Sequence, residues 1–224
     1  MKILIIVAME SEKRGFLDKV DFSVDYYLGF DFFRFFLDDK ECLLVKTEVG
    51  KTNAAIVSSL FISKFKPKYV INAGIGGAMC ENINVKETVI GSKVAYYDVD
   101  LTAFNLKKGQ LENHDLFFKT SKKLLNLSDD NDLHGLVVSG DSFVSNLDKA
   151  LEIKKDFPKA LVCDMESGAI AQTCNLFKKQ FLVIRCISDN VYKKFDNSEY
   201  EENKNSAIKI VVKKTLDIIH KIDN

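Results

Sequence analysis

The chain has 224 residues, of which 46% are hydrophobic and 29% charged, a composition that indicates a folded globular protein and excludes a disordered one. Lysine plus arginine equals aspartate plus glutamate at 32 each, so the charge balance gives no reason to expect nucleic acid or an anionic membrane as a partner. This length fits one domain with a full buried core.

In chain order, apolar runs rich in β-branched and aromatic residues alternate with runs of helical spacing. This alternation predicts a single α/β domain, residues 1–224, in three layers: a mixed, mostly parallel central sheet flanked by helices. The sheet is expected to be mixed because a polar break at Asp38–Glu41 indicates a hairpin. The predicted strands are residues 2–8, 31–37, 41–48, 69–73, 88–96, 135–139, 160–164 and 181–187. The predicted helices are residues 51–65, 116–126, 147–156, 166–178 and about 200–222.

Cysteine, histidine and hydropathy patterns narrow the class of protein. The five cysteines show no CxxC spacing, so we expect reduced thiols in a cytoplasmic protein. The three histidines are scattered, which predicts no zinc site. The first apolar run is short and is broken by Glu10 and Glu12, so we expect no secretory signal. Apolar stretches stay well below about 20 residues, so we expect no membrane span.

Three of the predicted strands end in acidic residues. The run ILIIVAMESE brings Glu12, ALVCDMESGAIAQ brings Asp164 and Glu166, and FLVIRCISDN brings Asp189. Small ligands bind at the carboxyl ends of the strands in an open α/β sheet. Acids gathered at that edge suggest acid–base chemistry on a small polyhydroxylated substrate. Taken singly, Glu12 and Glu166 could equally be acids that complement a helix N-terminus.

Other features of the sequence support a ligand site at the same edge of the sheet. NAGIGGA, residues 72–78, reads as a glycine-rich turn, which either lets the backbone approach a ligand or is a plain tight turn. Phe143 in SGDSF could stack on a base or belong to the core. Arg185 lies inside an apolar strand and needs a partner, because an unpaired buried guanidinium is costly. The carboxylate of Glu166 accepts hydrogen bonds only, which suits a vicinal diol that donates two.

Taken in order, these pieces resemble the 5′-methylthioadenosine/S-adenosylhomocysteine nucleosidases of the nucleoside phosphorylase-like α/β family. The matching segments span the chain: IIVAMESE, VGKTNAA, INAGIGG, YYDVDLTAF followed by KKGQ, GLVVSGDSF, DMESGAIAQ and IRCISD. The resemblance implies hydrolysis of the N-glycosidic bond of both nucleosides, releasing adenine and the 5-thioribose product in methionine salvage. It implies no metal or cofactor, and a homodimer whose partner completes the thioether pocket.

The resemblance also implies roles for individual residues. Glu12 would activate the attacking water as general base. Asp189 would protonate N7 of adenine, with Ser188 helping to orient it. Glu166 would accept hydrogen bonds from the ribose hydroxyls, helped by the Met165 backbone. N-glycosidic cleavage passes through an oxocarbenium-like centre, so a protonated base leaves more readily.

The remaining implied contacts are to the base and to the 5′-substituent. Phe143 would stack on adenine, the Val144 backbone would read its Watson–Crick edge, and Arg185 would support the site nearby. The residues expected to line or cover the 5′-alkylthio pocket are Met9, Val49, Leu101, Phe104 and Tyr200.

Three positions depart from the family pattern. Ile75 stands at a substrate-binding position of the glycine turn where the family usually has a serine, so a hydroxyl near the water and sugar is missing. Leu106 replaces an aromatic residue near the thioether pocket, and Glu112 replaces a proline that the partner subunit normally contributes. These changes bear on water positioning and on the breadth of 5′-substituents.

Three alternatives stay open from the sequence. A phosphorylase of the same fold needs a phosphate cradle, usually built with arginines, but the only arginines are Arg14, Arg34 and Arg185. A hydrolase for another purine nucleoside, of futalosine or 5′-deoxyadenosine type, stays open because of Ile75. A non-catalytic nucleoside-binding module is disfavoured, because a binder needs no water-activating base such as Glu12.

Overall fold

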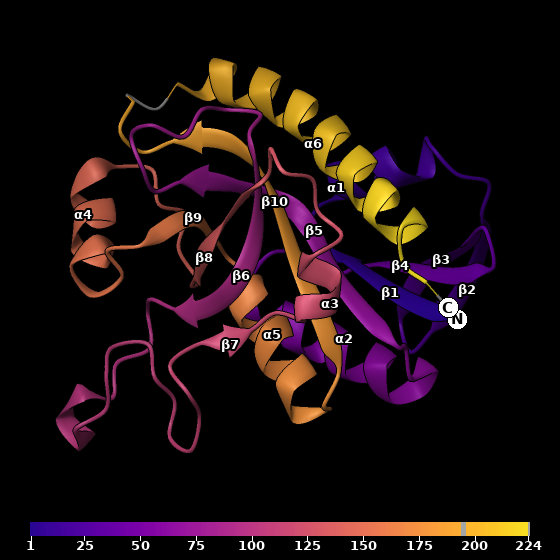
Figure 1. Cartoon of the computed structure of the whole chain (residues 1–224), viewed down its shortest axis with the longest axis horizontal. Helices are drawn as coiled ribbons and strands as arrows, with labels where there is room; N and C mark the ends of the chain where they lie inside the picture. Colours follow the sequence, from indigo (N-terminus) through magenta and orange to yellow (C-terminus); the bar gives the residue numbers. More distant parts are fainter. Residues whose placement is uncertain (194–195, 224) are drawn as a thin grey trace.

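The computed structural model, which describes residues 1–193 and 196–223, is organised around a ten-stranded mixed sheet (Figure 1). The strands are β1 (Lys2–Val7), β2 (Ser23–Tyr27), β3 (Phe30–Leu37), β4 (Lys40–Lys46), β5 (Tyr69–Ala78), β6 (Thr88–Tyr96), β7 (Phe118–Lys119), β8 (Leu133–Ser139), β9 (Ala160–Asp164) and β10 (Gln180–Asn190). The helices are α1 (Glu10–Leu17), α2 (Lys51–Phe65), α3 (Lys122–Leu125), α4 (Leu147–Asp156), α5 (Ser167–Leu176) and α6 (Asn197–His220), with a short 3₁₀ helix η1 (Thr102–Phe104).

Helices cover both faces of the sheet, which gives the three predicted layers. Ile3, Ile5 and Val7 of β1 pack in the core beneath α1 and α6, whereas Leu4 and Ile6 pack in the core beneath α2 and α5. Successive side chains of a strand point to opposite faces, so a strand buried on both faces must be apolar throughout. This is why residues 3–7, ILIIV, form an unbroken apolar run.

The order of the strands creates an opening at one end of the sheet. The strands β4, β1, β5 and β10 run parallel side by side. The pairing of β1 with β5 ends at Asn72, and the far end of β5 pairs instead with β9, through Gly77 and Ala78. From β9 the sheet continues through β8 and β6 back to β10. The carboxyl ends of β1, β5, β9 and β10 therefore meet around one space, the usual place for a ligand in such a sheet.

Most predicted strands and helices are confirmed, including the hairpin, which joins β3 to β4 with Leu37 opposite Lys40. The prediction that residues 72–78 form a turn is wrong, because β5 continues to Ala78. Two neighbours hold it extended: β10 pairs with it as far as Asn190, and β9 pairs with its last two residues. The edge strand β2 was not predicted.

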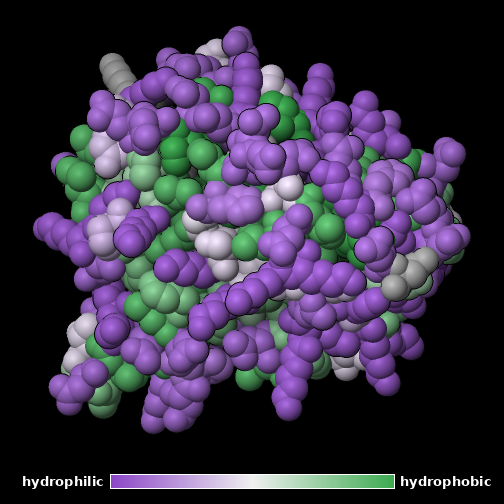
Figure 2. Space-filling model, viewed as in Figure 1, coloured by the Kyte–Doolittle hydropathy of each residue, from purple (hydrophilic) through white to green (hydrophobic). Residues whose placement is uncertain are grey.

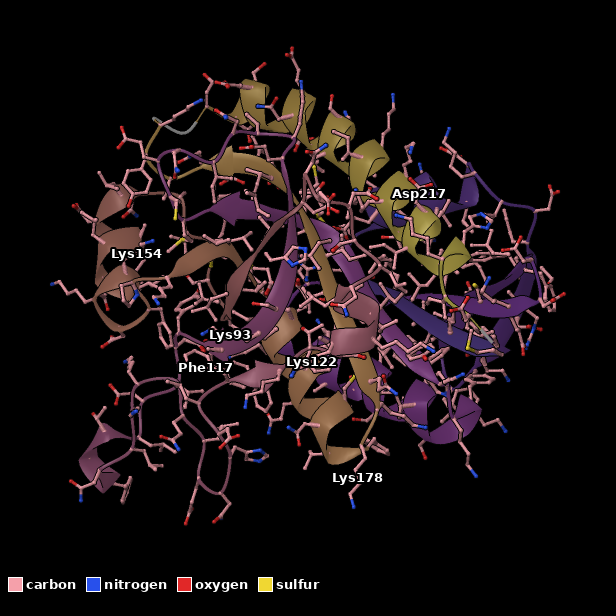
Figure 3. The ribbon with its side chains drawn as sticks, in the orientation of Figure 1. Lys93, Phe117, Lys122, Lys154, Lys178 and Asp217 are labelled. Carbon is pink, nitrogen blue, oxygen red and sulfur yellow. The ribbon has the colours of Figure 1, made fainter. Side chains whose placement is uncertain are left out.

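The predicted helix at residues 116–126 is largely wrong. Phe118 and Lys119 form β7, which pairs with β6, and only Lys122–Leu125 is helical. The Lys93 ammonium lies over the Phe117 ring, 4.3 Å from its centroid. Both residues are labelled in Figure 3. These contacts with β6 hold the segment extended until Ser121 begins the short helix.

Hydrophilic side chains cover most of the face drawn in Figure 2, with smaller apolar areas between them. In the described part of the chain, no helix has the length and apolar character that crossing a membrane requires. All five cysteines are free thiols, and four of them are buried.

Candidate active site

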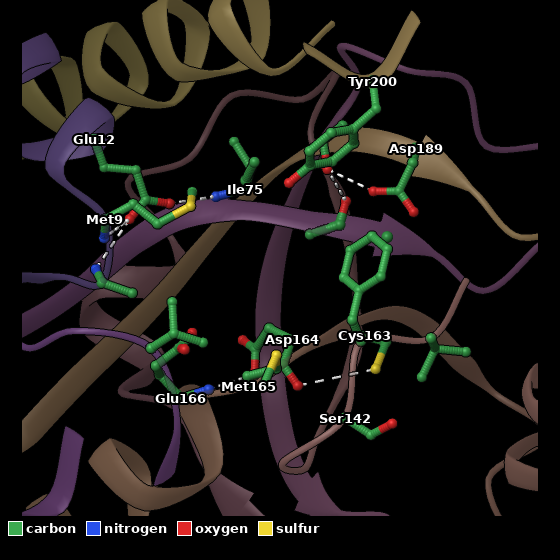
Figure 4. A pocket seen from close by; sticks show the side chains of 17 residues that line it. Met9, Glu12, Ile75, Ser142, Cys163, Asp164, Met165, Glu166, Asp189 and Tyr200 are labelled. Atoms are coloured by element: carbon green, nitrogen blue, oxygen red, sulfur yellow. Dashed lines mark hydrogen bonds between the residues drawn. The ribbon is translucent and has the colours of Figure 1, made fainter. Parts of the chain in front are cut away.

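A cavity opens where the strand ends meet, and most of the predicted site residues lie on its wall (Figure 4). These predicted residues are Met9, Glu12, Val49, Ile75, Phe143, Val144, Met165, Glu166, Ser188, Asp189 and Tyr200. The wall also includes residues that were given no individual role, although Asp164 and the glycine run were expected at this edge: Ala8, Gly76, Gly77, Ser142, Cys163 and Asp164. Figure 4 shows the carboxylates of Glu12, Glu166 and Asp189 on three sides of the same space.

Glu12 lies in the first turn of α1 and is only 3% exposed. Its Oε2 accepts the backbone N–H groups of Ala8 and Met9, each at 2.9 Å, and its Oε1 accepts that of Ile75 at 3.0 Å. Burial raises the pKa of Glu12, and the backbone N–H donors and the nearby Arg185 charge partly oppose this. The result is a carboxylate fixed in place, and a stronger base than an exposed glutamate.

The glycines of β5 make room for two of the carboxylates. A Cβ at Gly74 would lie 2.5 Å from Glu12 Oε1, and a Cβ at Gly77 would lie 3.0 Å from Asp189 Oδ2. Both distances are shorter than an ordinary carbon–oxygen contact. The glycine-rich run is therefore a strand whose missing side chains leave space for acids, which accounts for its composition better than a turn does.

Asp189 lies near the end of β10, beside Gly77 in the pairing with β5. The Ser188 hydroxyl donates to Asp189 Oδ1 at 2.7 Å. Burial raises the pKa of Asp189, and the hydrogen bond from Ser188 partly opposes the shift. An acid whose pKa is raised by burial keeps its proton to higher pH, which suits a proton donor.

Glu166 is the residue that precedes α5, and it is buried. Its Oε1 accepts the backbone N–H of Gly50 at 2.9 Å, across 116 positions of the sequence. Burial, together with the nearby Asp164 charge, raises the pKa of Glu166 to about 7. The sequence offered no signal for the Gly50 contact, because it depends on α2 and α5 packing side by side.

Arg185 lies beneath the cavity wall and is 1% exposed. Its Nε and Nη2 contact Asp164 Oδ2 at 2.9 and 2.8 Å, while Nη1 donates to the carbonyls of Asn72 and Ile184. Asp164 Oδ1 in turn accepts the N–H and hydroxyl of Ser167 at the start of α5. All three guanidinium nitrogens are thus engaged inside the protein. Arg185 supports the ends of β9 and α5 and does not contact the cavity.

Two aromatic residues of the cavity wall contact each other. The rings of Phe143 and Tyr200 meet edge to face with centroids 5.9 Å apart. Leu101 and Phe104 are not part of this wall: Leu101 directly precedes η1, Phe104 is the last residue of η1, and Phe104 is 74% exposed. Within a single chain, the predicted 5′-alkylthio pocket is therefore only partly assembled.

The cavity offers little to a metal or to phosphate. Among residues 1–193 and 196–223, no group of three or more His, Cys, Asp or Glu side chains could hold a metal ion. The described residues of the wall include neither lysine nor arginine. Arg14 pairs with Glu10, Arg34 pairs with Asp25, and Arg185 is buried with Asp164.

Comparison with known proteins gives consistent matches over the whole chain. A family model described as the phosphorylase superfamily matches residues 2–221. A 5′-methylthioadenosine/S-adenosylhomocysteine nucleosidase from Staphylococcus haemolyticus is 41% identical over 213 residues, 92% of this chain and 93% of the relative. One from Maridesulfovibrio salexigens is 36% identical over 99% of this chain and 100% of the relative. The solved structure of the S. pneumoniae enzyme with the transition-state inhibitor MT-ImmA matches with a TM-score of 0.93 and 33% identity, covering 100% of both chains.

Proposed function

The chain belongs to the phosphorylase superfamily and, within it, to the 5′-methylthioadenosine/S-adenosylhomocysteine nucleosidases, and from this premise we propose that it hydrolyses the N-glycosidic bond of both nucleosides. It is an N-glycosyl hydrolase, and its products are adenine and the corresponding 5-thioribose, as in methionine salvage. The observation that carries this proposal is the set of three buried carboxylates, Glu12, Glu166 and Asp189, around one cavity.

Two of these carboxylates supply the acid and base that the reaction needs. Glu12 takes a proton from the attacking water, a role supported by its fixed position and by its raised pKa. Asp189 gives a proton to N7 of adenine, a role supported by burial and by the Ser188 hydroxyl. Each such role typically contributes roughly 10²–10⁴-fold to the rate. Protonation withdraws electrons from the glycosidic bond as the ribosyl centre becomes oxocarbenium-like.

The other wall residues hold the substrate. Glu166 accepts hydrogen bonds from the ribose hydroxyls, beside the Met165 backbone. Phe143 stacks on adenine, and the Val144 backbone reads the edge of the base. Tyr200 lies edge to face with Phe143, so it is well placed to close that side of the cavity. The apolar side chains of Met9, Val49 and Ile75 suit a thioether better than a charged 5′-group.

Hydrolysis is favoured over phosphorolysis by the charge of the cavity. A phosphate nucleophile needs cationic donors, but the described wall has none and each arginine is paired elsewhere. A non-catalytic binding module is disfavoured, because it would gain nothing from burying Glu12 on three backbone donors.

We also propose a homodimer that works in the cytoplasm. The dimer is supported by Leu101 and Phe104, which stand away from the cavity of their own chain, with Phe104 exposed. A second subunit could receive them at its thioether pocket. The cytoplasm is supported by the five free thiols, which persist best in a reducing compartment.

Adenine release from 5′-methylthioadenosine, measured with and without phosphate, tests the reaction. Phosphate-independent release of adenine and free methylthioribose is expected. Release only in phosphate buffer would identify a phosphorylase. Binding of the nucleoside without release of adenine would indicate a non-catalytic module. If another nucleoside is the substrate, a panel with S-adenosylhomocysteine, 5′-deoxyadenosine and futalosine would identify it.

A further inference from the structure

Three charged residues outside the cavity wall join three chain segments. Lys51 Nζ donates to Asp98 Oδ2 at 2.6 Å, and the same oxygen accepts the backbone N–H of Asp141 at 2.9 Å. The backbone N–H of Lys51 donates to Asp141 Oδ1 at 2.7 Å. Lys51 Nζ also lies 5.3 Å from the centroid of the Tyr96 ring. Lys51, Asp98 and Asp141 form a closed set of contacts, termed here the Lys51 junction.

Two of the three segments that meet at this junction lead directly to residues of the proposed substrate site. Asp141 is followed by Ser142, Phe143 and Val144, all on the cavity wall. The residue before Lys51 is Gly50, whose N–H binds the carboxylate of Glu166. The junction therefore sets the position of the base-stacking segment relative to the residue that accepts the ribose hydroxyls.

The junction also caps α2 in an unusual way. The first N–H groups of a helix have no partner within it, and a side chain just before the helix usually accepts them. Here that residue is Gly50, which has no side chain and a φ of 105°. Two carboxylates from elsewhere accept instead: Glu166 takes the N–H of Gly50, and Asp141 takes that of Lys51. The positive end of the helix favours both charges.

We propose that Asp141 and Lys51 are positioning residues that hold the purine-stacking segment, residues 142–144, at the correct distance from Glu166. This inference rests on the proposed function. Neither side chain lies on the cavity wall, so both act through Phe143 and Glu166 and not through contact with the substrate. Glu12 and Asp189 are held by other contacts, so the junction acts on substrate binding more than on proton transfer.

Kinetics of Asp141→Ala and Lys51→Met test the proposal. Loss of a charged hydrogen bond predicts a KM for 5′-methylthioadenosine that is roughly 10-fold higher. The kcat should stay within about threefold of the wild-type value, which separates lost binding from lost chemistry. Lys51→Arg keeps the charge and donors and should restore KM. A matched control is Asn146→Ala, which removes the cap of α4 at the Lys149 N–H and should leave KM unchanged.

A double-mutant cycle shows whether Asp141 acts through the stacking ring. Adding Asp141→Ala to Phe143→Ala should raise KM little further, because the ring that Asp141 positions is already gone. The proposal would be overturned if the double variant multiplied the KM increases of the two single variants. It would also be overturned if Asp141→Ala had a wild-type KM, or if Asn146→Ala raised KM as much as Asp141→Ala does. Adenine affinity by calorimetry gives the same comparison without turnover. A wild-type protein that binds adenine but cleaves nothing would contradict the proposed function and still leave the positioning role testable.

Discussion

At the scale of single residues, three acids share one cavity but differ in the groups that surround them. Glu12 accepts three backbone N–H groups, Glu166 accepts one from Gly50, and Asp189 accepts the hydroxyl of Ser188. Burial raises the pKa of all three, and the backbone donors oppose the shift at Glu12. Different settings let carboxyl groups in one site serve as base, acid and hydrogen-bond acceptor.

Glu12→Gln should abolish turnover and leave binding largely intact. Glutamine keeps the shape of the side chain and one oxygen, which can still accept the N–H groups of Ala8 and Met9. Its NH2 group cannot accept the N–H of Ile75, and the amide takes no proton from water. Adenine release should fall by at least roughly 10²-fold, while adenine affinity by calorimetry stays near the wild-type value. Full turnover by this variant would exclude Glu12 as the base.

Asp189→Asn should slow adenine release by roughly 10²–10⁴-fold, because the amide does not protonate N7. The wild-type rate should also depend on pH in a defined direction. Asp189 must carry its proton, so kcat should decline as the pH rises through its raised pKa. The remaining rate of the variant should lack this decline. A near-normal rate would mean that another group protonates the base.

Glu166→Gln should bind substrate less well and yet make the protein more stable at alkaline pH. The folded-state pKa of Glu166, about 7, exceeds its ordinary value of 4.5, so the folded state holds this proton more tightly than the unfolded state. The contribution of this proton to the free energy of unfolding is complete below pH 4.5 and disappears as the pH rises through 7.

At pH 8 the wild type therefore carries a costly buried charge that glutamine removes. At pH 8 we expect the Tm of Glu166→Gln to exceed the wild-type value by roughly 2–4 °C for each kcal/mol of unfolding free energy regained. At pH 4.5 the two Tm values should differ little. Thermal denaturation at both pH values measures this. The exposed Glu202→Gln on α6 is the control, and an equal shift at both pH values would exclude the titration of Glu166 as the cause.

At the scale of elements, β5 links the sheet to the chemistry. Gly74→Ala places a methyl group 2.5 Å from Glu12 Oε1, so it should displace the proposed base and lower kcat sharply. Gly91→Ala is the matched control, because its Cβ would crowd Val137 at 2.8 Å, in the core and away from the carboxylates. The control should lower Tm but leave kcat of the folded protein near the wild-type value. An active Gly74→Ala enzyme would show that β5 does not constrain Glu12.

The elements that could be predicted from the sequence are those with a local signal. Apolar runs such as ILIIV identify buried strands, and the acids that follow them mark the ligand-binding edge. The extension of β5 to Ala78 could not be predicted, because glycines favour turns locally and only pairing with β9 and β10 holds them extended. The helix predicted at residues 116–126 failed for the same reason: Phe118 and Lys119 are held extended by pairing with β6, a contact between distant parts of the sequence.

The candidate site follows the same rule. The positions of Glu12 and Asp189 at the cavity could be predicted because Glu12 follows one recognisable strand and Asp189 lies near the end of another. The sequence indicated that Arg185 needs a partner but did not identify it, and the structure shows that the partner is Asp164, in a buried contact at 2.8 Å. The Lys51 junction gave no signal, because Asp98 and Asp141 lie 47 and 90 residues from Lys51.

At the scale of the whole molecule, one chain brings together the residues proposed to bind the base and the ribose, but not all of those proposed for the thioether. The cavity wall draws on residues from Ala8 to Tyr200, so the site depends on the entire fold. The segment that carries Leu101 and Phe104 stands apart from the arrowheads of β5 and β10 in Figure 1. An exposed phenylalanine on such a segment suits contact with a second subunit.

A subunit-mixing experiment tests this arrangement. The chain should sediment as a dimer, and Phe104→Ser should lower kcat/KM for 5′-methylthioadenosine more than for adenosine, which lacks the thioether. If Phe104 serves the cavity of the partner, then a Phe104→Ser subunit keeps its own Glu12 and receives an intact Phe104 from a Glu12→Gln subunit. Equal mixing and random exchange should restore about a quarter of the wild-type sites. If Phe104 instead serves the cavity of its own chain, the activity of the mixture will be only the average of the activities of the two parent variants. The thioether pocket must then close within one subunit.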